Sequence, residues 1–197
     1  PLLTHKPSHI NMSRFHTPLR YPGGKAKFAP IIESIIRNNN LISGHYLEPF
    51  AGGAGVALYL LINNVCSEIH INDYAEAVYN FWKAMLENTE DFIDKIISTE
   101  ITMSEWHKQK EILEFPEAHS LLDKGFATFF LNRTNHSGIL KGGVIGGQKQ
   151  AGKYKLDARF NKSNLIKRIE RIAKLKDRIH LYNEDAYALL NRCDSFL

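Results

Sequence analysis

Residues 46–55 read Tyr46-Leu47-Glu48-Pro49-Phe50-Ala51-Gly52-Gly53-Ala54-Gly55. The run His45–Glu48 predicts a short strand that ends in an acid, and the largely apolar run Ala54–Asn63 predicts a helix. A glycine-rich turn between them lets the backbone approach a ligand closely, and it points the first amide groups of the helix at that ligand. The sequence therefore predicts an α/β fold with a ligand bound at this turn.

A second predicted strand, Glu68–Asn72, ends at Asp73, twenty residues after Gly53. A carboxylate at that place can accept hydrogen bonds from the two hydroxyls of a ribose. Upstream, Lys25 follows a Pro-Gly-Gly turn and stands at the start of a helix. A cation opposes the helix dipole there, so Lys25 is better explained as the partner of a ligand carboxylate. These features predict a nucleoside cofactor.

The cofactor can be narrowed by comparison with the dinucleotide fingerprint. Leu58 stands where that fingerprint requires its last glycine, and Glu48 would repel phosphates, so a nicotinamide oxidoreductase is disfavoured. S-adenosylmethionine fits better, because it has a cationic sulfonium and an amino group at one end and a ribose at the other. The alternative is a tight strand–helix turn that binds no ligand.

The rest of the chain changes character after Glu87. Before it, helices at Ala29–Arg37 and Ala75–Glu87 alternate with the strands. From Thr89 to Asn132 we predict three consecutive helices, the first two capped by Thr89 and Ser104. A glycine-rich hairpin or loop at 138–152, a basic helix at 163–176, a strand at 179–182 and a helix beginning at Asp185 complete the prediction.

This pattern predicts an α/β domain that is interrupted by a helical insertion. Residues 12–86 form its cofactor-binding part, residues 87–160 form the insertion with its hairpin, and residues 161–197 return to the α/β domain. Residues 1–11 are expected to be an upstream or non-native leader, because the first methionine is Met12.

The charge is unevenly distributed. The net charge is +4, yet the segment from Arg133 to Arg178 has 13 Lys or Arg residues and only three acids. Such a segment predicts a polyanionic partner, although a solvated basic helix face is the alternative. No apolar run is long enough to span a membrane and no secretory signal is visible, so we expect a cytoplasmic monomer. No histidine or cysteine shows ligand spacing, so no metal is expected.

Four ordered motifs resemble the Dam-like family of DNA adenine-N6 methyltransferases, in the subgroup whose target-recognition insertion precedes the catalytic motif. They are Tyr21-Pro-Gly-Gly-Lys25, Glu48-Pro-Phe-Ala-Gly-Gly-Ala-Gly55, Ile71-Asn-Asp73 and Phe130-Leu-Asn-Arg-Thr-Asn-His-Ser-Gly138. The resemblance covers residues 14–197. It implies a Rossmann-like sheet that uses S-adenosylmethionine, and a site-specific enzyme that methylates adenine N6 in duplex DNA, as in restriction–modification systems.

The resemblance also implies roles for particular residues. The cofactor-binding residues would be Tyr21, Lys25, Glu48, Phe50, Gly52, Gly53, Gly55, Asp73 and, as the weakest match, Asp185. The DNA-binding residues would be Asn132, Arg133, Lys141, Lys149, Lys153 and Lys155.

The catalytic motif of the family is missing from these residues. Adenine N6 is a poor nucleophile, and the family activates it with a D-P-P-Y-like motif, whereas no Pro-Pro pair occurs among the seven prolines here. We expect this motif to lie beyond Leu197, the last residue of the sequence, so that the chain is truncated before it. We also expect an incomplete sheet and a chain that is inactive alone. The alternatives are a non-catalytic fragment that binds cofactor or DNA, and an RNA methyltransferase.

Overall fold

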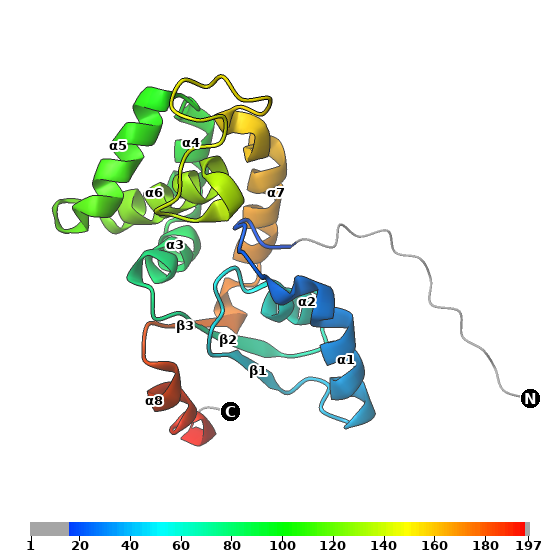
Figure 1. Ribbon diagram of the computed structural model, residues 1–197. Coiled ribbons are helices and arrows are strands. Elements are labelled where there is room, and N and C mark those ends of the chain that lie inside the picture. The colour runs from blue at the N-terminus through cyan, green and yellow to red at the C-terminus, as the bar shows by residue number, and fades with distance from the viewer. Residues whose placement is uncertain (1–15, 196–197) are drawn as a thin grey trace, which may run out of the picture.

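The structure is a computed structural model that describes residues 16–195, shown in Figure 1. Two predictions lie outside the described residues: the leader at residues 1–11, and the chain end at Leu197, beyond which the catalytic motif is expected. Within residues 16–195, a small sheet carries a group of helices that pack mainly on one another (Figure 1). No helix in this part of the chain is both long enough and apolar enough to cross a membrane.

The sheet has three parallel strands in the order β1-β2-β3, and the α/β prediction is confirmed. These strands are β1 (His45–Glu48), β2 (Glu68–Asn72) and β3 (Ile179–Tyr182), at the positions that the sequence predicts. In the register, His45 pairs with Glu68, and His70 pairs with His180. Because side chains alternate along a strand, directly paired residues lie on the same face of the sheet.

One face of the sheet is covered by helices and forms part of the core. Ile69 and Ile71 of β2 are buried on this face. Helix α2 (Gly55–Ile62) packs against β1 and β2, and its apolar residues are largely buried. Figure 1 shows α2 and the following helix α3 (Glu76–Glu87) on one side of the sheet, with α8 (Ala186–Leu190) on the other. The second face is polar, and the residues on it are described below.

The remaining helices pack mainly on one another, beyond α3 as seen from the sheet (Figure 1). Gly125 lets α6 approach α3, because a Cβ at that position would lie 2.5 Å from the Cβ of Ala84. Buried phenylalanines, including Phe81 and Phe129 with stacked rings, fill the space between these helices. The helices are α4 (Thr89–Ser98), α5 (Met103–Glu114), α6 (Leu121–Thr134) and α7 (Lys162–Ala173).

Helix α1 (Ala29–Asn38) precedes the sheet, and Ile31 and Ile35 on it are exposed. Short 3-10 helices complete the described residues: η1 (Lys25–Phe28), η2 (Pro116–Ala118), η3 (His136–Gly138), η4 (Leu156–Arg159), η5 (Lys176–Arg178) and η6 (Cys193–Ser195).

Two local predictions are wrong. Thr89 is the first residue of α4, where its hydroxyl donates to the Met85 carbonyl (2.8 Å), so it does not cap the helix. Thr102, and not Ser104, caps α5 by accepting a hydrogen bond from the Glu105 amide (3.2 Å). Both Ser and Thr favour this position, and composition alone does not select between neighbours.

The glycine-rich segment at 138–152 is folded as a series of turns. Where a hairpin or loop was expected, the structure has a single antiparallel bridge between Asn135 and Val144.

Candidate cofactor and DNA site

A cavity of about 760 Å³ lies beyond the carboxyl end of β1, within the size range of small-molecule sites. Three parts of the chain line it: the segment 17–26, the turn between β1 and α2, and residues of the helical part. Carboxyl ends of parallel strands are the usual place for a ligand in an open α/β sheet. The residues that the argument uses are Arg20, Tyr21, Lys25, Glu48, Phe50, Arg133, Arg159 and Arg168.

The turn between β1 and α2 has a backbone that depends on glycine. Gly52 has a φ of +48°, and a Cβ added to it would lie 2.6 Å from Cε2 of Tyr21. The ring of Tyr21 therefore lies directly against the glycine backbone. Ala54 also has a φ of +48°, and it is fully buried. The absence of a side chain at Gly52 thus permits close contact with a residue of the Tyr21–Lys25 motif, while the predicted approach to a ligand stays a prediction.

Glu48 places a carboxylate at the wall of the cavity. Its Oε2 accepts a hydrogen bond from the Ala57 amide at the start of α2 (3.2 Å). Burial raises the pKa of Glu48 to about 7, while that hydrogen bond and the charge of Lys25 act in the opposite direction. A cationic ligand in the cavity would favour the ionised form of this carboxyl.

Asp73 lies behind the turn and does not line the cavity. Its Oδ2 accepts from the Gly52 amide and its Oδ1 accepts from the Ala75 amide, both at 2.9 Å. Trp82 is buried, and its indole N–H donates to the Gly52 carbonyl (2.9 Å). Both polar groups of Gly52 are therefore held by side chains, and Trp82 is a residue of the site that sequence reasoning missed.

Of the other predicted cofactor residues, most line the cavity and Asp185 does not. Gly53 and Gly55 line the cavity with Tyr21, Lys25, Glu48 and Phe50, and the Phe50 side chain is 75% exposed. Asp185 is not brought to the cavity. It caps α8 by accepting from the amides of Tyr187 (3.0 Å) and Ala188 (3.1 Å).

Four arginines surround the same cavity, although only Arg133 was predicted. Arg20, Arg159 and Arg168 lie on its wall with Arg133, and within residues 16–195 none of the four makes an ion pair with an acid. Arg133 instead donates to the carbonyl of Arg159, and Arg168 donates to that of Thr17 (2.9 Å).

The lowered pKa of Arg133 reflects its burial and the positive charges of the three other arginines. Burial lowers it most, and the charges of Arg20, Arg168 and Arg159 lower it further. Because guanidinium groups keep their proton in proteins, the shift means that the charge is destabilised by its surroundings. An anion at this wall would relieve the repulsion. Arg159 and Arg168 lie with Arg133 in the basic segment 133–178 that predicts a polyanionic partner, whereas Arg20 lies more than a hundred residues before it and had no such signal.

The predicted DNA residues other than Arg133 lie in two different environments. Asn132 is 3% exposed, and its side-chain amide bonds to the Arg20 backbone at both N–H and C=O (2.7 Å each) and to the Gly138 carbonyl (2.9 Å). It therefore joins the first motif to the loop after α6. Four lysines are exposed along that loop and just after it: Lys141, Lys149, Lys153 and Lys155.

A second polar cluster lies on the polar face of the sheet, opposite α2 and α3, and was not predicted. His45, His70 and His180 come from the three strands, and Glu68 lies among them. Burial lowers the pKa of His70 to about 4, and the charges of His180 and His45 add to this effect. A signal was present in the sequence, because Glu68, His70 and Asn72 occupy alternate positions of one strand.

Comparison with known proteins gives one finding. The profile of a family described as D12 class N6 adenine-specific DNA methyltransferase matches residues 21–196. This match includes the turn, all three strands and three of the four arginines, and it begins one residue after Arg20. A search of curated proteins found no match.

Proposed function

Because this chain belongs to the D12 class N6 adenine-specific DNA methyltransferase family, we propose that its cavity binds S-adenosylmethionine beside duplex DNA. The single observation that carries the proposal is that one cavity has a half-buried carboxylate on one wall and, on another, four arginines that form no ion pair with an acid within residues 16–195. A cationic cofactor and a polyanionic substrate need these two kinds of surface next to each other.

The carboxylate wall suits the amino-acid end of the cofactor. Glu48 would pair with the ammonium group or lie near the sulfonium, and Lys25 would pair with the carboxylate. Tyr21 and the exposed Phe50 offer apolar surface at the same cavity. Asp73 supports the turn through Gly52, and we propose that its carboxylate also accepts from the ribose, as the resemblance implies.

The arginine wall suits the phosphates of DNA. Arg20, Arg159 and Arg168 are added to Arg133 as proposed phosphate contacts, because each lines the cavity and lacks an acidic partner among the described residues. The exposed lysines of the loop after α6 would extend this surface, and residues 87–160 would form the part that recognises the target. Asn132 is better suited to positioning, since its amide is occupied by backbone groups.

The chemistry of transfer requires a further element. The 197 residues contain no Pro-Pro pair and hence no D-P-P-Y-like motif to accept the hydrogens of the adenine amine. We propose that these residues bind cofactor and DNA, and that transfer depends on such a motif being supplied with them.

Calorimetry with S-adenosylmethionine tests the cofactor part of the proposal. We expect micromolar binding with a stoichiometry of one, and loss of that binding in Asp73→Ala. The matched control is Asp177→Ala, which removes a carboxylate from η5, outside the cavity. Absence of binding by a chain whose circular dichroism shows it to be folded would contradict the proposal.

A further inference from the structure

We propose that the cluster on the polar face of the sheet is a site for a divalent transition-metal ion such as Zn²⁺, held by His45, Glu68 and His70. Each residue offers one ligand atom, and these atoms lie within 4.8 Å of one another. Two imidazoles and a carboxylate are a recurrent ligand set for zinc, with a further position left for water.

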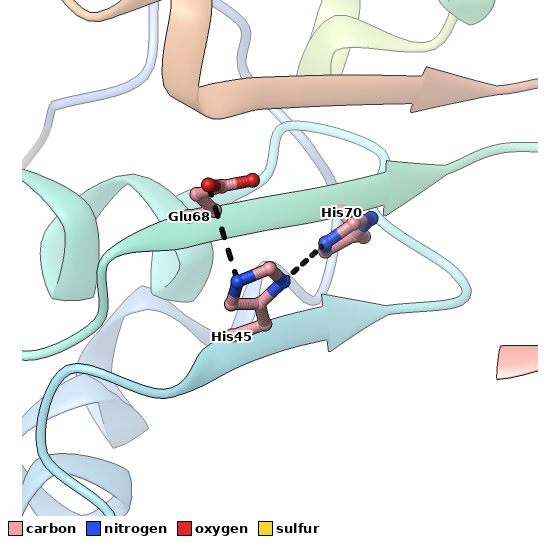
Figure 2. Close-up of side chains that lie close together, drawn as sticks. All are labelled: His45, Glu68 and His70. Carbon is pink, nitrogen blue, oxygen red and sulfur yellow. Dashed lines mark hydrogen bonds and ion pairs between the residues drawn. The ribbon is translucent and has the colours of Figure 1, made fainter. Parts of the chain in front are cut away.

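The geometry follows from the strand register. His45 and Glu68 are directly paired between β1 and β2, and His70 lies two residues further on the same face. Figure 2 shows the ring of His45 between the other two side chains. Nδ1 of His45 is 3.0 Å from Nε2 of His70, close to the roughly 3.3 Å that two nitrogens on one tetrahedral zinc would have.

Glu68 has to rotate to complete the set. Its Oε1 is 3.9 Å from Nε2 of His45 (Figure 2), the ring nitrogen opposite the one that faces His70, so the carboxylate must turn until one oxygen meets the ion bound at Nδ1. The Glu68 side chain is 35% exposed, which leaves room for that rotation. The His45 side chain is 30% exposed, so an ion can reach the cluster from solvent.

Neighbouring residues orient these ligands as they do in known metal sites. Nε2 of His180 is 2.6 Å from the second oxygen of Glu68, which leaves Oε1 on the side of His45. Nδ1 of His70 is 2.9 Å from the Tyr182 hydroxyl, so Nε2 can carry the lone pair. Metal-binding histidines and carboxylates are commonly held by such hydrogen bonds.

The position suggests what the ion does. The cluster lies toward the amino ends of β1 and β2, whereas the cavity lies at the carboxyl end of β1. Within the described residues, β1 pairs with β2 alone, along four residue pairs. The ion would therefore join the edge strand to its neighbour, and its effect would be on stability and not on the chemistry of the cavity.

The competing explanation is a hydrogen bond between the two imidazoles with no ion. Both explanations are compatible with 3.0 Å, because an N–H···N hydrogen bond has a similar length. Only the metal site predicts that the protein takes up zinc, so a zinc titration distinguishes the two explanations.

The test is a zinc titration of the chelator-stripped 197-residue chain by calorimetry and thermal unfolding. We expect one zinc per chain at this site, and a rise in Tm of roughly 5–10 °C at a hundredfold excess over Kd. Binding should be lost in His45→Ala and retained in His107→Ala, which removes an exposed histidine of α5. Ions bound at other histidines would remain in both variants.

A second variant and a second measurement distinguish loss of the metal site from misfolding of a variant. Glu68→Gln keeps the shape of the side chain, and it should also lose the site. Co²⁺ in place of zinc should give visible absorption bands that disappear in both variants. His180→Ala should weaken binding about ten- to hundredfold without abolishing it. The proposal is overturned if the wild-type chain takes up no zinc, or if His45→Ala and Glu68→Gln bind it as the wild type does.

Discussion

The carboxyl of Glu48 shows how a single residue can be unfavourable for folding and useful for binding. Burial raises its pKa to about 7, from 4.5 in the unfolded chain. An acid with a raised pKa in the folded state stabilises the fold below its unfolded value, and this contribution is lost as the pH rises through about 7. Above that pH the ionised group is buried at the wall of the cavity, where a cation could neutralise it.

We therefore predict that Glu48→Gln stabilises the free protein at pH 8. The gain in the free energy of unfolding is at most roughly 3 kcal/mol, which corresponds to the difference between the two pKa values. The gain should shrink toward zero as the pH falls to 4.5. Urea unfolding at both pH values measures it.

The same substitution should weaken binding of S-adenosylmethionine by about tenfold or more, because a charge-assisted contact is lost. Binding by the wild type should itself weaken about tenfold from pH 8 to pH 6, beyond any change seen in the variant, since only the ionised carboxyl attracts the cofactor. A variant that is less stable than the wild type at pH 8 would contradict this account of Glu48.

Arg159 offers a test of the arginine wall at the scale of one residue. Its side chain is exposed at the cavity, while its carbonyl accepts from Arg133, so Arg159→Ala removes a charge and keeps that contact. We expect weaker binding to duplex DNA, with the slope of log K against log salt reduced by about 1. Lys83→Ala, an equal change of charge on α3 outside residues 87–160 and outside the cavity, should leave the slope unchanged.

Salt titrations of binding to duplex DNA and to RNA also decide between a DNA and an RNA substrate. Tighter binding to RNA than to duplex DNA at matched salt would favour the RNA alternative. An unchanged slope in Arg159→Ala would remove Arg159 from the proposed phosphate contacts.

At the scale of elements, the turn between β1 and α2 leaves no room for a Cβ at Gly52 while Tyr21 stays in place. Gly52→Ala adds a Cβ that would lie 2.6 Å from the tyrosine ring, at a φ of +48°. We expect a loss of stability of about 1–3 kcal/mol and a loss of cofactor binding, because Tyr21 must move away. Gly143→Ala is the control, since nothing lies within 4 Å of its added Cβ.

Chemical unfolding and calorimetry of the two glycine variants measure these effects. If Gly52→Ala bound cofactor as tightly as Gly143→Ala does, the contact between the turn and Tyr21 would have no part in the site.

The elements also show which local predictions could succeed. The three strands lie at their predicted positions, because each is a short run that contains β-branched, aromatic or leucine residues and ends at a turn. The cap of α5 was placed two residues late, at Ser104, because Thr102 and Ser104 are equally suitable and only the backbone geometry distinguishes them. A strand could thus be predicted from the composition of several successive residues, whereas the choice of cap residue depends on the backbone angles at a single position.

For the whole molecule, the central prediction is binding without transfer. The 197 residues up to Leu197 should bind cofactor and DNA but transfer no labelled methyl group to adenine in duplex DNA, because no D-P-P-Y-like motif is among them. An active adenine methyltransferase in the same assay is the positive control. Label recovered as N6-methyladenine from this chain would show that other residues can activate the amine.

By itself, the sequence determined the α/β class, the strand positions and the motif from Glu48 to Gly55, because each depends on residues that are neighbours in the chain. Tertiary structure decided that Arg20, Arg159 and Arg168 join Arg133 at one cavity, across more than a hundred positions. It also brought three histidines together, because the pairing of His70 with His180 depends on the register between β2 and β3, which are distant in the sequence. Local patterns follow from the intrinsic preferences of the residues, whereas these groupings arise only when packing brings distant segments together.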